Sequence, residues 1–389
     1  MTELVSVQTT ATSRPVAPMP RNGTMPSQGT MPSQRTMQPP AALPSPGSHG
    51  GDAATIAVAL GRNPSTMLDL SASLNPFAPN LRDKVIRHID TGVLGRYPDD
   101  ADATCLLADA MGVDPTRLVL TNGGSEAIAL VAAILGRGWV VEPEFALYCK
   151  HIPVLDPAGP RFRSNPCNPL GLLAGAAEQA SVWDEAFYPI STGQWTRGDS
   201  GDSAAAQHAW RPESGSGSQS SMASAFGPVV VGSLTKLYAC PGLRIGYVLA
   251  PDDRFAAETR RRRPQWSVNS LAVALLPELL QETDLSAWSR AIESARAELT
   301  DVLQSHGFSV RPSEAPWVLV DEHEDAVGAL DCDAESPTSL GSLRERLARL
   351  GVVVRDCTNF GLPATVRIAV PDADGLGRLD VALSCLRDN

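Results

Sequence analysis

Short apolar segments recur along the middle of the chain, each bounded by glycine, proline or charged residues, as buried strands often are. They are residues 118–121, 139–142, 180–183, 229–232 and 246–249. Residues 125–135 form a longer apolar run after a glycine-rich turn, and this pattern predicts a helix. Strands that alternate with helices predict an α/β fold with a mostly parallel central sheet.

The pattern changes after Pro264. Longer helical stretches at residues 268–280 and 285–305 are followed by a further helical stretch at residues 340–350 and by three short apolar segments. The short segments are residues 317–320, 352–355 and 365–370. We therefore predict a large domain over residues 49–265 and a smaller α+β C-terminal domain over residues 266–389.

Two stretches lack an apolar pattern. Residues 1–48 are rich in Pro, Ser, Thr, Gln and Met, and such a stretch cannot bury enough apolar surface to offset its ordering entropy. Residues 191–227 form a second stretch of this kind between two predicted strands, where a structureless connection of this length is uncommon. We predict a disordered tail and a flexible surface insertion.

The charge balance limits the kinds of partner. The chain has 389 residues and a net charge of −11, whereas nucleic acid and anionic lipid need a basic face, so a small-molecule substrate fits better. The seven cysteines show neither zinc-like spacing nor a disulfide framework. No apolar run has the length of a membrane span, and the first residues lack the features of a secretory signal. We expect a cytoplasmic protein with no nucleic acid, membrane or metal partner.

The most specific chemistry lies just beyond the predicted strand at residues 229–232. Lys236 has Ser233 three residues before it and Arg244 eight residues after it. A lysine amine can form a Schiff base with the aldehyde of pyridoxal 5′-phosphate (PLP), while a hydroxyl and a guanidinium bind the cofactor's phosphate. A lone lysine would usually be a surface residue, but the whole pattern predicts a PLP site with Lys236 carrying the cofactor.

This segment closely resembles the Schiff-base motif of class I/II aminotransferases. It is most similar to the motif of threonine-phosphate decarboxylases of cobalamin biosynthesis and of histidinol-phosphate aminotransferases. The resemblance covers roughly residue 48 to the C-terminus, apart from the predicted insertion. It implies the aspartate-aminotransferase fold, also called PLP fold type I, and a homodimer with shared active sites.

Further cofactor motifs follow in the order of that family. The TNGGSEAI segment resembles the family's phosphate cup, which implies phosphate contacts from Gly124 and Ser125. Phe145 matches the aromatic residue that stacks on the PLP pyridine ring. Asn168, in NPCNPLG, matches the residue that hydrogen-bonds the phenolic oxygen of PLP. Asp184 matches the carboxylate that keeps the pyridine nitrogen protonated.

The resemblance also implies residues that bind the substrate or lie across the dimer interface. Arg367 matches the family's carboxylate-binding arginine, and Arg355 matches a second basic position found in relatives with phosphorylated substrates. Tyr97 matches a tyrosine that reaches the PLP phosphate of the partner subunit. Three further residues lie in segments that resemble the decarboxylases, whose N-terminal segment folds over the substrate pocket. These lid or pocket residues are His49, Gly51 and Asn75.

The spacing of the motifs departs from the family. About twenty residues separate Phe145 from Asn165 and about sixteen separate Asn168 from Asp184, whereas relatives usually have more. Phe187 stands where many aminotransferases have a tyrosine, although decarboxylase-like relatives also carry Phe there. Elements of the large domain are therefore expected to be shortened or lost.

Three functions remain open at this point. Lys236 and Asp184 are the expected catalytic residues for both decarboxylation and transamination. The first hypothesis is a decarboxylase of L-threonine-O-3-phosphate in cobalamin biosynthesis. The second is a histidinol-phosphate-type aminotransferase. The third, from another class, is a catalytically weak PLP-binding or regulatory protein.

Overall fold

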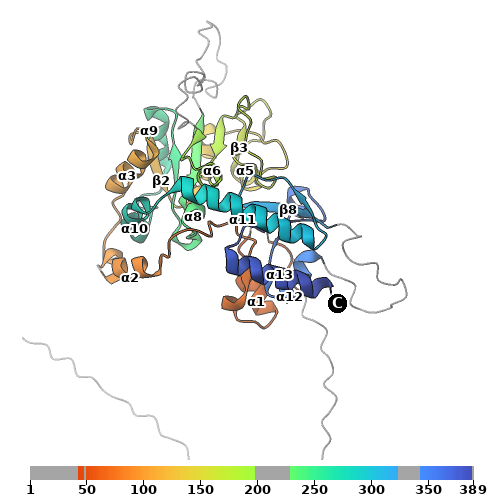
Figure 1. The fold of residues 1–389 in the computed structure, drawn as a ribbon. Coiled ribbons are helices and arrows are strands. Elements are labelled where there is room, and N and C mark those ends of the chain that lie inside the picture. Colours follow the sequence, from red (N-terminus) through yellow and green to blue (C-terminus); the bar gives the residue numbers. More distant parts are fainter. Residues whose placement is uncertain (1–42, 48–49, 91, 198–227, 323–341, 388–389) are drawn as a thin grey trace, which may run out of the picture. The chain divides into compact units, whose positions relative to one another are not determined.

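The computed structural model describes residues 43–47, 50–90, 92–197, 228–322 and 342–387. Its larger sheet has five strands (Figure 1). Their order across the sheet is β2 (Leu118–Thr121), β6 (Gly246–Leu249), β5 (Val229–Ser233), β4 (Val182–Asp184) and β3 (Phe162–Ser164). Strand β6 is antiparallel to both of its neighbours and the other four strands run in one direction, which confirms the predicted mostly parallel sheet.

Helices cover both faces of this sheet. Val229 and Val231 of β5 pack into one hydrophobic cluster and Val230 packs into another, because side chains alternate along a strand. The first cluster includes α4 (Gly124–Leu135), α5 (Leu147–His151) and α9 (Asp253–Arg262). The second includes α3 (Ala101–Met111), α6 (Tyr188–Thr192), α8 (Leu234–Leu237), α10 (Ser270–Gln281) and the first half of α11 (Leu285–Ser305).

A smaller antiparallel sheet lies in the C-terminal part of the chain. Its strand order is β10 (Arg355–Asp356), β11 (Thr365–Ala369), β8 (Trp317–Asp321) and β7 (Ser309–Arg311). The end of α11 packs on it together with α12 (Leu343–Arg349) and α13 (Ala373–Arg387). Strand β1 (Leu68–Asp69) pairs in parallel with β9 (Val352–Val353), and α1 (Ala53–Ala59) packs against that pair.

The remaining elements connect these layers. Helix α2 (Arg82–Asp90) contacts α10. The described residues also include the short 3₁₀ turns η1 (Pro64–Thr66), η2 (Val93–Gly95), η5 (Pro241–Leu243) and η7 (Thr358–Phe360). None of the helices within the described residues is both long and apolar enough to cross a membrane.

Helix α11 packs into the hydrophobic cores of both sheets, and it runs toward β8 in Figure 1. Its Ile292 belongs to the core of the larger sheet, whereas Leu299 and Leu303 belong to the core of the smaller sheet. Leu275 of α10 also packs with the larger sheet, so that core continues beyond residue 265, where the sequence placed the division. An apolar stripe shows that a helix face is buried but not which sheet covers it.

Three segments differ from their sequence-based expectations. Residues 43–47, expected in the disordered tail, include Leu43, which packs beside α1. Residues 191–197, expected in the insertion, are folded, and Thr196 is buried. The strand expected at residues 139–142 is absent. Only two isolated bridges form there, between Gly138 and Leu155 and between Trp139 and Arg161. The rest of the tail and of the insertion lies outside the described residues.

Candidate active site

A cavity of about 300 Å³ lies between the ends of strands β3, β4 and β5 of the larger sheet and strands β10 and β11 of the smaller sheet. Side chains from the segments around both sheets line it. Ten of the residues predicted from the sequence are among them: Gly124, Ser125, Phe145, Asn168, Asp184, Ser233, Lys236, Arg244, Arg355 and Arg367. The motifs that lie far apart in the chain therefore converge on one site.

Lys236 lies in the short helix α8, which follows directly from strand β5. Burial, together with the charges of Arg367 and Arg244, lowers the pKa of its amine to about 8, although Asp69 opposes the shift. The amine also lies 5.7 Å from the centre of the Phe187 ring. A lysine with a lowered pKa has a larger neutral fraction and is a better nucleophile at neutral pH.

The chain has two other lysines, and their surroundings differ. Lys84 forms ion pairs with Glu278 and Glu282, and its hydrogen bond to Glu282 raises its pKa. Lys150 is exposed at the end of α5. Among the three lysines, Lys236 is the one that lines the cavity and has a lowered pKa.

An anion cradle lies beside Lys236, at the start of α4. A Cβ atom placed on Gly123 would lie 2.4 Å from the guanidinium of Arg244, and one on Gly124 would lie 3.2 Å from Cβ of Ser233. The two glycines therefore let the helix start approach the arginine and the hydroxyl closely. The Ser233 hydroxyl lies 2.8 Å from that of Thr235. Backbone N–H groups at a helix start, hydroxyls and a guanidinium together suit a phosphate group.

Asp184 lies at the end of β4 and is held from two sides. The Tyr148 hydroxyl donates to its Oδ2 at 2.8 Å, and the Ala186 N–H donates to its Oδ1 at 3.0 Å. Burial raises the pKa of Asp184, while these two hydrogen bonds lower it. Phe145 packs edge-on against Tyr148, with ring centres 5.6 Å apart. A buried carboxylate of this kind can pair with a protonated ring nitrogen.

Arg367 and Arg355 enter the cavity from adjacent strands of the smaller sheet, where they form a cross-strand pair. Arg367 donates to Oδ1 of Asn168 at 2.6 Å, and its guanidinium lies 5.0 Å from the centre of the Trp317 ring. Burial lowers the pKa of Arg367 to about 10 and also lowers that of Arg355. Arg355 donates to Asn359 at 2.9 Å and to the carbonyl of Gly47.

Three of the predicted residues that the structure describes do not line the cavity. Tyr97 is 77% exposed and stacks on Trp266, with ring centres 4.4 Å apart. Asn75 is buried behind the wall, where its backbone N–H donates to the carbonyl of Lys236 at 3.0 Å. Gly51 donates to the hydroxyl of Ser71, and its neighbour Gly50 lines the cavity instead. His49 lies outside the described residues.

The sequence did not single out several lining residues. Tyr148 and Ser164 are the most informative, because both hydrogen-bond residues that the motifs did identify. Tyr148 follows Phe145 by three residues, a spacing that places both on one face of a helical turn. Ser164 carried no such signal. The other additional lining residues include Ala72, Leu147, Thr235 and Phe360.

The donor set matches PLP group by group. The cradle at Gly124 and Arg244 suits its phosphate, and Asp184 suits its ring nitrogen. Lys236 supplies the amine that reacts with an aldehyde. Among the described residues no group of histidines, cysteines and carboxylates could hold a metal ion. Fold and site together define a PLP-dependent enzyme of fold type I.

Comparison with known proteins gives the family. The model of "Aminotransferase class I and II" matches residues 164–379, which is more than half of the chain. The chain therefore belongs to this PLP-dependent family of transaminases and related decarboxylases.

Two curated relatives represent the two activities. The chain is 28% identical to threonine-phosphate decarboxylase of Salmonella typhimurium, over 86% of this chain and 95% of the relative. It is 27% identical to histidinol-phosphate aminotransferase 2 of Methylococcus capsulatus, over 82% and 89%.

Solved structures show the same fold. L-threonine-O-3-phosphate decarboxylase from Porphyromonas gingivalis has a TM-score of 0.62 at 21% identity, covering 82% of this chain and 99% of that structure. Histidinol-phosphate aminotransferase from Sinorhizobium meliloti in complex with PLP has a TM-score of 0.67 at 17% identity, covering 92% and 99%.

Proposed function

We propose that this chain decarboxylates a small phosphorylated amino acid, L-threonine-O-3-phosphate being the first candidate, as a step toward cobalamin. The observation that carries the proposal is the pair of buried arginines, Arg355 and Arg367, in the same cavity as Lys236. A phosphorylated amino acid has two anionic groups, a carboxylate and a phosphate. Two guanidinium groups offer one partner to each.

The site residues divide the work of binding PLP. Gly124, Ser125, Ser233 and Arg244 would hold the phosphate, and Asp184 would hold a proton on the ring nitrogen. Phe145 would contact the face of the ring and Asn168 its phenolic oxygen. Bound PLP supplies an electron sink for bond cleavage at the substrate's α-carbon.

The choice of bond depends on how the protein orients the substrate. Arg367 and Arg355 would bind the carboxylate and the phosphate, and their positions would decide which bond at the α-carbon is cleaved. For decarboxylation, they would direct the carboxylate toward loss as CO₂. Lys236, with a pKa of about 8, could then deliver a proton to the α-carbon at neutral pH. For transamination, Lys236 would instead remove the proton of the α-carbon.

The alternative is a histidinol-phosphate-type aminotransferase. Histidinol phosphate has a phosphate group but no carboxylate, so one of the two arginines would lack an anionic partner during that half of the reaction. The similarity to the Methylococcus capsulatus enzyme keeps this alternative in place.

We also propose that two copies of the chain complete each other's sites. Tyr97 and Trp266 form an exposed aromatic pair that does not line the chain's own cavity, so Tyr97 is free to reach the phosphate of the partner's cofactor. Gly50 lines the cavity, with Gly51 beside it, and Asn75 would support the Lys236 loop through its backbone N–H.

Product analysis tests the proposed activity. The PLP-loaded protein is incubated with L-threonine-O-3-phosphate alone, and separately with histidinol phosphate and 2-oxoglutarate, with Lys236→Ala as the control. CO₂ and aminopropanol phosphate from the wild type alone would support the decarboxylase. Glutamate from the second mixture would instead support the aminotransferase. Bound PLP without turnover of either substrate would favour a binding or regulatory role.

A further inference from the structure

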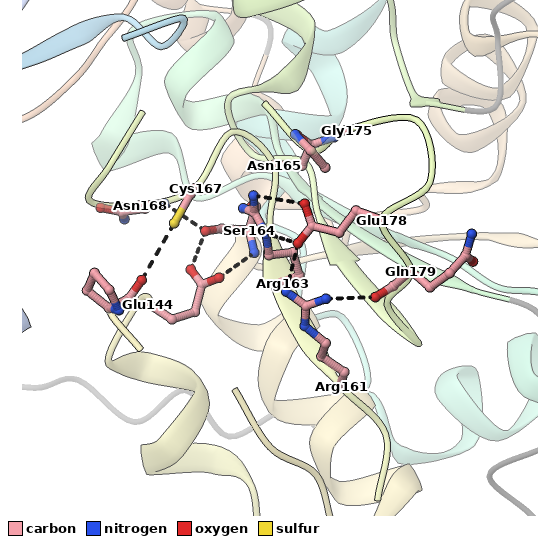
Figure 2. A network of polar contacts seen from close by, with 12 residues as sticks. Glu144, Arg161, Arg163, Ser164, Asn165, Cys167, Asn168, Gly175, Glu178 and Gln179 are labelled. Atoms are coloured by element: carbon pink, nitrogen blue, oxygen red, sulfur yellow. Dashed lines mark hydrogen bonds and ion pairs between the residues drawn. The ribbon is translucent and has the colours of Figure 1, made fainter. Parts of the chain in front are cut away.

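A buried carboxylate lies behind the cavity and has no part in the site described above. Glu144 is only 2% exposed, and three donors surround it. The Ser164 hydroxyl donates to its Oε1, as does the Phe145 N–H at 3.0 Å, and the Ser164 N–H donates to its Oε2 at 3.1 Å. Figure 2 shows Glu144 facing Ser164. A carboxylate with this many buried donors holds their geometry firmly.

The Ser164 hydroxyl connects Glu144 to the cofactor site. Its oxygen accepts the Asn168 N–H at 2.8 Å, a contact drawn in Figure 2. Asn168 is the residue whose amide oxygen accepts from Arg367. Burial raises the pKa of Tyr148, and a hydrogen bond with the same Ser164 hydroxyl opposes that shift. A single hydroxyl thus joins Glu144 to the loop that carries Asn168 and to the tyrosine behind the ring-nitrogen site.

We infer that Glu144 is a positioning residue of the cofactor site, which holds the Asn168 loop in place through the Ser164 hydroxyl. The inference rests on the proposed function, because it gives Glu144 a role only if PLP occupies the cavity. Ionised Glu144 accepts a hydrogen bond from the Ser164 hydroxyl, which leaves the lone pairs of that oxygen to accept from the Asn168 N–H. A protonated Glu144 is a weaker acceptor and carries a donor of its own, so its hydrogen bond with the Ser164 hydroxyl weakens or reverses.

The groups around Glu144 make this change accessible. Burial raises the pKa of Glu144 to about 7, although hydrogen bonds and the charge of Arg163 oppose the shift. The titratable and charged groups that face Glu144 are Arg163 from β3, Tyr148 and Cys149 from α5, Cys167 from the loop after β3, and Glu142 from its own segment. The pKa values of Tyr148, Cys149 and Cys167 are raised, so these groups stay neutral where Glu144 titrates.

The charge of Glu144 also acts on the site through space. Burial is the main cause of the raised pKa of Tyr148, and the charge of Glu144 adds to it. Glu144 is not among the charges that act on Lys236, whose pKa is lowered by burial, Arg367 and Arg244. The hydrogen-bonded route from Glu144 to Asn168 runs through the Ser164 hydroxyl.

The test compares PLP affinity at two pH values. The apparent Kd for PLP is measured by absorbance titration of wild type and Glu144→Gln, at pH about 6 and about 8.5, on either side of the Glu144 pKa. Glutamine keeps the shape but never ionises. We expect Glu144→Gln to bind PLP about five-fold more weakly than wild type at the higher pH, the effect of one disturbed hydrogen bond, and nearly equally at the lower pH. Taking the ratio at each pH cancels the titration of Lys236 and of the PLP phosphate.

Two further variants separate positioning from simple destabilisation. Glu178→Gln neutralises a carboxylate of the same polar network, which pairs with Arg161 and Arg163 but makes no hydrogen bond to Asn168 (Figure 2). Its ratio to wild type should stay near one at both pH values. Ser164→Ala removes the connecting hydroxyl, so adding Glu144→Gln to it should weaken binding no further.

The outcomes are distinct. A ratio that is the same at both pH values, or effects of Glu144→Gln and Ser164→Ala that add, would overturn the positioning role. An equal change in Glu178→Gln would do so as well. Failure of the wild type to bind PLP would instead remove the proposed function itself.

Discussion

The glycine at the start of α4 gives the sharpest test of the anion cradle. Gly123 has φ +78° and ψ 170°, a region that is essentially restricted to glycine. A Cβ there would lie 2.4 Å from the Arg244 guanidinium, which is the mobile end of a flexible side chain. In Gly123→Ala the arginine therefore moves away, and the loss falls on phosphate binding as well as on folding.

The expected sizes follow from these two contacts. Backbone strain at such a position costs about 1–3 kcal/mol of folding free energy. Loss of charge-assisted hydrogen bonds from Arg244 to the PLP phosphate costs about 1.5–3 kcal/mol, which raises the Kd for PLP about 10- to 100-fold. Thermal unfolding of the PLP-free protein measures the first quantity, and absorbance titration with PLP measures the second.

Gly112→Ala is the matched control. Gly112 ends helix α3 with φ +67°, and a Cβ there would meet nothing within 4 Å. This variant should lose about 1–2 kcal/mol of stability and bind PLP as the wild type does. Wild-type PLP affinity in Gly123→Ala would refute the close approach of Arg244 as the basis of the anion site.

Three other substitutions probe the remaining parts of the site. Lys236→Met should raise the thermal stability of the PLP-free protein at neutral pH, because the native pKa of about 8 is lower than 10.5 and burial penalises the charged amine. The gain should shrink as the pH rises from about 8 toward 10.5, where wild type gains stability; a pH-independent gain in differential scanning calorimetry would contradict this. Arg367→Lys loses the planar contact to Asn168 and should lower kcat/KM for the substrate about 10- to 100-fold, whereas an unchanged value in steady-state kinetics would remove its role in binding the carboxylate. Tyr148→Phe removes a donor from Asp184, so the pKa of that carboxyl should rise and kcat should fall about ten-fold; a kcat equal to that of wild type would show that the hydroxyl is dispensable.

The sequence was sufficient to predict cavity-lining residues where they form a contiguous pattern. Lys236, Ser233 and Arg244 lie within twelve residues, and the strand before them is apolar, so local chemistry and element type agree. The order of the other motifs along the chain placed Asp184 and Asn168 in the same site, and the cavity includes both. The resemblance to a family identified these two residues, which their spacing alone did not.

The sequence was insufficient where function depends on packing between distant segments. Glu144 and Ser164 are twenty residues apart and belong to no motif, and only the fold brings them together. Leu43 has no apolar periodicity around it, so its packing on α1 could not be foreseen. Tyr97 does not line the chain's own cavity, so any role it has in binding the cofactor needs a second copy.

The attachment of PLP to Lys236 is the central claim, and the chain's lysine content makes it directly measurable. The protein has three lysines, Lys84, Lys150 and Lys236. PLP-loaded protein is reduced with sodium borohydride, which fixes the cofactor on its lysine, and is then digested and analysed by peptide mass spectrometry. We predict the pyridoxyl phosphate mass on the peptide that contains Lys236. The same mass on a peptide with Lys84 or Lys150, or on no peptide, would contradict the account.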